Sequence, residues 1–379
     1  MDWLLRSFCC IHLPSCVMIA SNRHRPWLDI LRAIACFGVV LAHTGGLVAK
    51  ESSESRVNSI KIIFSAGRLG VEVFFFLSGL LLATLYEVGG DVDGAISSTR
   101  RYLVRRFSRI WPLWSLFAFV WAIKIVYIEN RSLDFAVVGL LLSLSFMLWT
   151  SPTHNQGGMP GATSIQQEVA LYLVFWTLRR RPISWIITLT IIINVLGVVV
   201  SFSALSELGV SSSLRRLSLQ TGMNFFVLGM VLARAQACVP ENTDIKQLAQ
   251  IFRRTITPIR AALLSIWLGT FLFAPASYGN TIEAVGFLAL SVVVTSLISQ
   301  VPRLSRLFQY IGQRSYFVFF SHFLVLEIFY KSFRLEIDGT LAIMAIPLLA
   351  VLVTSICLIV ANLSFRYFES PLMRMARKV

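Results

Sequence analysis

Charged residues are scarce in this sequence. Asp, Glu, Lys and Arg together make up 14% of its 379 residues, whereas 56% of the residues are hydrophobic. Soluble domains carry about 25% charged residues, so the composition excludes an ordinary soluble protein. A mean hydropathy of +0.72 predicts instead a polytopic membrane protein.

Acidic residues are the scarcer charged class, 19 against 34 basic residues, which gives a formal net charge of +15. The basic residues form short runs between apolar segments. In a membrane protein such runs mark cytoplasmic loops. We therefore expect membrane lipids, and no nucleic acid, as partners of the basic surface.

Cysteine is sparse as well, and the six cysteines show no paired spacing. That spacing argues against a disulfide framework. Cys9, His12 and Cys16 lie close together in the sequence and leave a metal site as an alternative, but the pattern as a whole predicts no bound metal.

The N-terminal segment lacks both an uninterrupted apolar run and a small-residue cleavage site. Residues 1–20 contain Arg6, His12 and Pro14, which make the segment too interrupted to cross a bilayer. We expect residues 1–22 to be a cytoplasmic extension and residues 23–379 to form one membrane domain.

Long apolar runs fill the rest of the chain. There are eleven of them, at residues 27–47, 65–87, 110–129, 135–149, 164–178, 183–203, 217–236, 259–274, 281–300, 310–331 and 341–365. Runs of about 20 apolar residues predict transmembrane helices. The predicted fold class is therefore all-α, a polytopic bundle of membrane helices.

The basic runs set the topology. They lie before the first apolar run, after the second, fifth, seventh and ninth, and at the C-terminal end. All of them are cytoplasmic only if the short run 135–149 enters the membrane and returns without crossing. We therefore predict about ten transmembrane helices plus one re-entrant segment, with both termini cytoplasmic and residues 151–163 outside. Arg215 and Arg216 would then be external and fit this arrangement poorly.

The first apolar run keeps three ionisable residues, Asp29, Arg32 and His43. Such residues are rare in membrane helices and are usually functional. On an α-helix, eleven positions place Arg32 and His43 within about 20° of one face and roughly 16 Å apart along the axis. One helix face therefore carries a cation toward the cytoplasm and an imidazole toward the outside.

Other polar residues take their depths from the same topology. Glu72 and Glu168 lie early in helices that start outside, so we expect them at the level of His43, around one outer cavity. Arg106 and Arg109 lie one helical turn apart at the cytoplasmic side, where Arg32 also lies.

These residues occur in an order that resembles the acyltransferase 3 family of integral-membrane O-acyltransferases, over residues 26–374. The similarity rests on six motifs, which are Leu28, Asp29, Leu31, Arg32, Ala33 and His43; Gly70, Val71, Glu72, Phe74, Phe75, Leu77, Ser78 and Gly79; Arg105, Arg106, Arg109, Ile110 and Pro112; Glu168; Ile311, Gly312, Ser315, Tyr316 and His322; and Phe365, Arg366, Tyr367, Glu369 and Pro371. The chain departs from the family at Glu72, where Asp is more common, and at residues 163–165, where the family usually has Trp-Ser-Leu.

The resemblance implies transfer of an acyl group, often acetyl from acetyl-CoA, and the family's essential His corresponds to His43. The chemistry agrees, because an alcohol that attacks a thioester needs a base, and imidazole suits this role near neutral pH. Glu168, or in second place Glu72, would orient the imidazole. The alternatives are structural: His43 is a packed residue bonded to a backbone carbonyl, and the carboxylates are helix-start charges.

The inner arginines are candidates for donor binding. CoA carries several phosphate charges, and Arg binds phosphate through its planar set of donors. We expect Arg32, Arg106 and Arg109 to contact acyl-CoA, a donor substrate rather than a bound cofactor. Pairing of Arg32 with Asp29 is the alternative. The neighbouring basic residues are better explained as topology anchors, namely Arg100, Arg101 and Arg105.

Five further residues are candidates for the substrate path, namely Ser78, Tyr172, Ser315, Tyr316 and His322. For the small residues the alternative is close helix packing. For His322, which could join a proton path, the alternative is a hydrogen bond between helices.

We therefore expect a bacterial inner-membrane O-acetyltransferase that modifies an exopolysaccharide, a lipopolysaccharide or a lipid-linked precursor of either. Because the sequence ends soon after its last apolar run, we expect direct transfer from acyl-CoA to that glycan. Two alternatives stay open. A transporter or flippase would favour broken helices and repeat symmetry, and a non-catalytic partner in polysaccharide export would tolerate replacement of His43.

Overall fold

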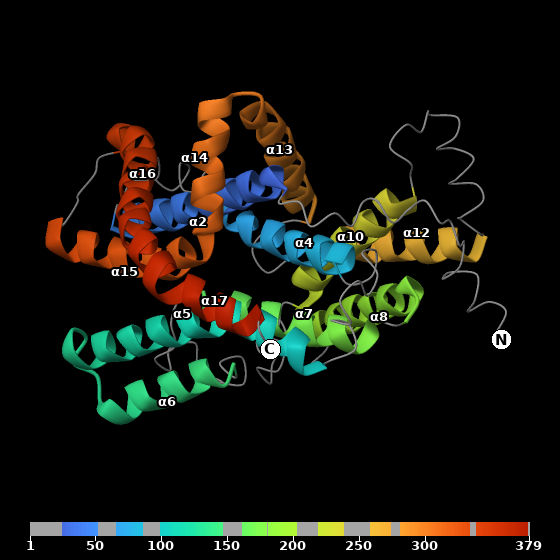
Figure 1. The fold of residues 1–379 in the computed structure, drawn as a ribbon, viewed down its shortest axis with the longest axis horizontal. Coiled ribbons are helices and arrows are strands. Elements are labelled where there is room, and N and C mark those ends of the chain that lie inside the picture. Colours follow the sequence, from blue (N-terminus) through green and yellow to red (C-terminus); the bar gives the residue numbers. More distant parts are fainter. Residues whose placement is uncertain are drawn as a thin grey trace. The chain divides into compact units, whose positions relative to one another are not determined.

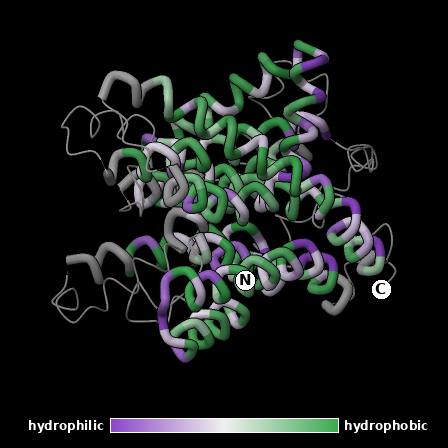
Figure 2. The backbone as a smooth tube through the Cα atoms, turned by 90° about the vertical axis from the view of Figure 1, so that its left-hand side faces the viewer, coloured by the Kyte–Doolittle hydropathy of each residue, from purple (hydrophilic) through white to green (hydrophobic). Residues whose placement is uncertain are grey.

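The computed structural model describes residues 25–51, 66–85, 99–146, 161–179, 181–202, 219–238, 258–273, 281–333 and 339–377. All secondary-structure elements in these residues are helices, and apolar colour follows most of them in Figure 2. The all-α prediction is thus confirmed for the described part of the chain. The predicted extension 1–22 and most of the predicted outer loop 151–163 lie outside it.

The described helices fall into two compact units. One, the α2 unit, comprises Arg25–Phe74, Arg100–Gln166 and Tyr278–Val379; the described residues of the other, the α8 unit, lie within Phe75–Thr99 and Gln167–Ser277. Figure 1 labels the helices of both units.

The α2 unit is built around its first helix, which packs against η2, α13, α14, α15 and α16. Its elements are α2 (Pro26–Glu51), η2 (Ala66–Leu69) and the start of α4 (Gly70–Ala83), α5 (Thr99–Tyr127), α6 (Leu133–Leu144), α13 (Thr281–Ser299), α14 (Pro302–Gln313), α15 (Ser315–Phe333), α16 (Gly339–Ser364), the π-helical turn η6 (Phe365–Glu369) and α17 (Ser370–Arg377).

Two kinds of contact hold α2 in place. A Cβ atom at Gly67 would lie only 2.0 Å from the carbonyl oxygen of Gly38, and one at Gly70 only 2.2 Å from that of Ala35, so glycine lets the two backbones touch. On another side, α2 shares a buried core with α15 and α16, formed by Cys36, Val40, Val318, Leu326, Ala350, Val353 and Cys357. The middle of α2 is therefore closely packed, and its polar residues are left at its ends.

The α8 unit contains most of α4 and α7 (Ala162–Leu178), together with α8 (Ile183–Phe202), α10 (Leu219–Cys238) and α12 (Pro258–Phe273). The helix α8 packs against α10 and α12. Asn194 and Asn224 exchange two hydrogen bonds of 3.1 and 3.0 Å, and Trp267 Nε1 donates to Asn224 Oδ1 at 3.0 Å. Both asparagines are fully buried, so this polar network joins the three helices.

Every predicted apolar run overlaps at least one described helix, but the predicted number of crossings is not established. In the described residues five stretches are long and apolar enough to span a membrane, namely Pro26–Val48, Ala66–Ala83, Tyr102–Tyr127, Ile282–Ser299 and Met344–Met375. The chain is thus a membrane protein. The 12-residue α6 is about 18 Å long, and the re-entrant course of the run 135–149 stays a prediction.

Two boundaries differ from the expected ones. The helix α5 begins at Thr99, so the arginines expected between two runs form its first turns. The run 310–331 is divided at Arg314, where α14 ends and α15 begins. The short helix α14 packs on α2, so this corner brings the start of α15 to the start of α2.

Candidate active site

Arg32 and His43 lie on one unbroken helix, α2. A regular helix keeps residues eleven positions apart on nearly the same face, about 16 Å from each other along the axis. The predicted placement on one helix is confirmed. The two residues mark the two ends of the candidate site, the Arg32 end and the His43 end.

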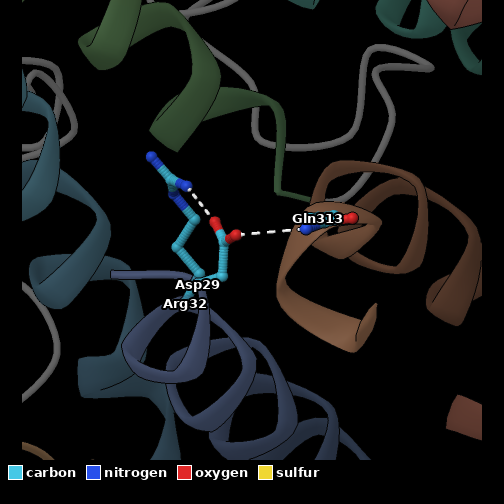
Figure 3. Close-up of polar contacts among 3 residues, drawn as sticks. All are labelled: Asp29, Arg32 and Gln313. Atoms are coloured by element: carbon cyan, nitrogen blue, oxygen red, sulfur yellow. Dashed lines mark hydrogen bonds and ion pairs between the residues drawn. The ribbon is translucent and has the colours of Figure 1, made fainter. Parts of the chain in front are cut away.

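Asp29 and Gln313 hold the Arg32 end. Arg32 Nη1 donates to Asp29 Oδ1 at 2.7 Å, and Gln313 Nε2 donates to Asp29 Oδ2 at 3.4 Å. A Cβ atom at Gly312 would lie 1.9 Å from the Asp29 carbonyl oxygen, so α14 touches the start of α2. Figure 3 shows the carboxylate between the two partners, with the guanidinium extending away from Gln313. The pairing of Arg32 with Asp29, which was the structural alternative, is therefore present.

Arg109 of α5 and Tyr316 of α15 lie at the same end. Arg109 Cζ is 4.9 Å from the centroid of the Tyr316 ring, within the range of a cation–π contact. Both residues interact electrostatically with Arg32. The structure thus brings Arg32 and Arg109 together, and Arg106 lies one turn earlier on α5. Two neighbouring guanidinium groups repel each other, so an anion bound between them would relieve the repulsion.

The His43 end is aromatic. The His43 ring lies 5.4 Å from the ring of His322 and 4.4 Å from that of Phe323, and the last two rings are 4.2 Å apart, all between centroids. Arg68 of η2 acts electrostatically on His43. The structure thus brings His43 together with His322, which sequence analysis placed on a substrate or proton path without a partner.

His322 is fully buried, and its two ring nitrogens differ. Nδ1 lies 3.1 Å from the Val318 carbonyl oxygen one turn earlier. Nε2 is buried and has no hydrogen-bond partner among the described residues. A hydrogen bond within one helix therefore accounts for only one nitrogen of the ring.

Glu72 does not share the level of His43. The contact of Gly67 with Gly38 and of Gly70 with Ala35 runs antiparallel along α2, so Glu72, further along α4, lies toward the Arg32 end. The prediction that Glu72 and His43 lie at the same level is wrong. Backbone contacts at the glycines, rather than the ends of the apolar runs, determine the axial offset between the two helices. Glu72 lies in the first turn of α4, is 4% exposed, and its Oε2 has no partner among the described residues.

Glu168 belongs to the α8 unit, together with two residues of the predicted substrate path. Ser78 Oγ and Tyr172 Oη donate to Glu168 Oε1 at 3.0 and 2.5 Å. The helix dipole acts most strongly in the first turn of a helix. Glu168 lies after the first turn of α7, so the alternative of a helix-start charge does not explain it. The structure joins these three residues; the expected partnership of Glu168 with His43 stays a prediction.

Ser315 starts α15 and is fully buried. Its carbonyl oxygen accepts a hydrogen bond of 3.5 Å from Cys36 Sγ, while its own Oγ has no partner within the described residues. The contact with Cys36 therefore explains the position of the Ser315 backbone but not the buried hydroxyl.

Sequence analysis missed an ion cluster that joins α5 to α15. Lys124 Nζ lies 2.5 Å from both Glu129 Oε1 and Glu327 Oε2, and 3.8 Å from the centroid of the Trp121 ring. Lys124 and Glu327 each interrupt an apolar run. A charged residue within an apolar run costs free energy in a membrane and is usually paired with an opposite charge. The positions of Lys124 and Glu327 are therefore the sequence signal that predicts this cluster.

Metal-ligating side chains do not gather in the described part of the chain, where no three His, Cys, Asp or Glu residues lie close enough to hold an ion. Cys9, His12 and Cys16, the grouping that left a metal site as an alternative, lie outside that part.

Comparisons with known proteins agree with the motifs. The model of the acyltransferase 3 family, described as "Acyltransferase domain", matches residues 25–362. Two relatives from Staphylococcus aureus, "Putative O-acetyltransferase SAS0844" of strain MSSA476 and "Putative O-acetyltransferase SAR0937" of strain MRSA252, are each 23% identical over 382 residues. The match covers 92% of this chain but only 57% of each relative. No solved structure matches.

Proposed function

The chain belongs to the acyltransferase 3 family, and from this membership we propose that it is a membrane O-acyltransferase. It moves an acyl group, most simply acetyl, from cytoplasmic acyl-CoA to a hydroxyl of a surface polysaccharide or its lipid-linked precursor. The observation that carries the proposal is α2 itself, which has guanidinium groups gathered at one end and two imidazoles at the other.

The Arg32 end suits the donor. Arg32 and Arg109 supply positive charge from two helices, and Arg106 adds a third guanidinium on α5. Arginine contacts phosphate through two parallel hydrogen bonds, which fits the phosphates of CoA. Asp29 keeps the side chain of Arg32 in place. We assign this end to the cytoplasmic side because basic residues next to membrane helices are mostly cytoplasmic.

The His43 end suits the reaction. The acceptor hydroxyl attacks the thioester carbonyl carbon while His43 takes its proton, the new C–O bond forms, and the C–S bond breaks. The thiol of CoA leaves with the proton that His43 returns to it. The surrounding aromatic rings keep bulk water away, which limits hydrolysis of the thioester.

The setting is the cytoplasmic membrane of a bacterium, with acyl-CoA inside and the acceptor outside. The bacterial relatives named as O-acetyltransferases support this assignment. The proposed acceptor of the whole protein is a glycan.

The test compares O-acetyl esters on surface glycans of cells that produce the wild-type or the His43→Ala protein at equal membrane levels. We expect the ester content to fall to background in the variant, because a general base contributes about 10²- to 10⁴-fold to the rate. Equal ester content in both strains would contradict the role of His43. An ester content in wild-type cells no higher than in cells without the protein would contradict the enzyme activity and favour a transporter.

A further inference from the structure

The His43 end contains a second imidazole that the proposed mechanism does not use. His322 is fully buried on α15, and its ring lies 5.4 Å, centroid to centroid, from that of His43. Buried polar atoms almost always have a partner, and an exception calls for an explanation. Nε2 of His322 is such an exception within the described residues.

The neighbour of the other nitrogen fixes which tautomer His322 adopts. Nδ1 lies 3.1 Å from the Val318 carbonyl oxygen, and a carbonyl oxygen only accepts hydrogen bonds. Nδ1 must therefore carry the hydrogen, and in the neutral ring Nε2 is left with a lone pair. His322 thus offers an acceptor, and no donor, on the side that does not face its own helix.

We infer that His322 is a positioning residue for His43. Its Nε2 accepts a hydrogen bond from the ring N–H of His43. The other ring nitrogen of His43 then carries the lone pair that takes the proton of the acceptor hydroxyl. This inference rests on the proposed function. The arrangement has the logic of a catalytic triad, in which the third group holds the imidazole in the productive tautomer. Here the third group is itself held by a backbone carbonyl.

Phe323 restricts both rings. Its ring lies 4.4 Å from that of His43 and 4.2 Å from that of His322, so it packs against the pair. At a centroid distance of 5.4 Å the two imidazoles are in contact, and a small rotation or one bridging water completes the chain from the Val318 carbonyl through His322 to His43.

A pair of amide variants separates this role from packing. In His322→Asn the amide nitrogen takes the place of Nδ1 and still donates to Val318, but nothing replaces Nε2. In His322→Gln the amide oxygen takes the place of Nε2 and can accept from His43. Both variants keep a polar, uncharged side chain of related size, so each is the control for the other.

The measurement is release of free thiol from acetyl-CoA by membranes containing the full chain, with de-esterified surface glycan of the producing cells as acceptor. We expect kcat to fall about 100-fold in His322→Asn and less than about tenfold in His322→Gln, with the KM for acetyl-CoA unchanged in both. Membrane level and melting temperature are measured in parallel. Should His322→Asn fail to accumulate, His322→Leu, which also lacks the acceptor, replaces it.

The outcomes are distinct. Wild-type kcat in both variants, or an equal loss in both at equal membrane level, overturns the positioning role while the proposed function stands. No turnover by the wild-type protein overturns the proposed function itself. High activity in His322→Gln together with loss in His322→Asn or His322→Leu supports the inference.

Discussion

The two ends of α2 differ in the kind of contact that surrounds them, polar at the Arg32 end and aromatic at the His43 end. At the Arg32 end, Asp29 joins the guanidinium to Gln313 of α14. At the His43 end, the rings of His43, His322 and Phe323 lie against one another, and one ring nitrogen has no partner among the described residues.

This difference matches the two tasks that the proposed function assigns to these ends. A cation that binds a mobile anionic donor benefits from side chains already fixed in place, because less conformational entropy is lost on binding. A base must instead exchange a proton, and it needs an accessible lone pair in a site with little water. Variants at the Arg32 end should therefore change donor affinity, whereas those at the His43 end should change kcat.

The largest effect that sharpens the comparison is expected from reversing two charges on α5. Arg106→Glu combined with Arg109→Glu should weaken acyl-CoA binding at least about 100-fold, because each charge-assisted hydrogen bond contributes about 1.5–3 kcal/mol. Direct binding of a non-hydrolysable acyl-CoA analogue to the purified protein measures this. The control is Arg100→Glu with Arg101→Glu, which changes the same charge earlier on α5. Equal affinity in both double variants would reject the phosphate contact.

An intermediate effect should come from the ion cluster between α5 and α15, because α15 carries Tyr316 at one end of the site and His322 at the other. Lys124→Met removes the cation that lies between the carboxylates of Glu129 and Glu327, so we expect a loss of about 1–3 kcal/mol in the free energy of unfolding. Melting temperatures in detergent measure it.

Adding Glu327→Gln to Lys124→Met removes one of the two negative charges that faced Lys124 and should restore part of the melting temperature. An unchanged melting temperature in Lys124→Met alone would show that the cluster does not hold α15 in place.

The smallest effect is expected in the α8 unit, away from both ends of α2 in the sequence. Asn194→Leu leaves Asn224 without its side-chain partner on α8, and we expect a loss of about 1 kcal/mol, in line with hydrogen bonds between membrane helices. Thermal unfolding checks the stability, and kcat and donor affinity should both stay at wild-type values.

The matched comparison is Asn194→Leu with Asn224→Leu, which removes the second amide and also the acceptor of the Trp267 N–H. Its stability should lie further below wild type than that of the single variant, because a buried donor then lacks a partner. A drop in kcat for Asn194→Leu at full stability would show that this network belongs to the reaction after all.

The sequence alone determined the elements and the spacing along α2. Helix formation depends on local hydrophobicity and on backbone hydrogen bonds four residues apart, so apolar runs predicted every described membrane helix, and the positions of Arg32 and His43 predicted a shared face. The family motifs pointed to the same residues.

Only the tertiary structure decided which residues meet. Gln313 reaches Asp29, and His322 reaches His43, from helices far along the chain, and no periodicity encodes such pairings. The level of Glu72 was mispredicted because the close contact of Gly67 and Gly70 with α2 sets the offset of the two helices. Contacts of this kind depend on the shapes of both packed surfaces. The sequence pattern of a single helix therefore does not predict them.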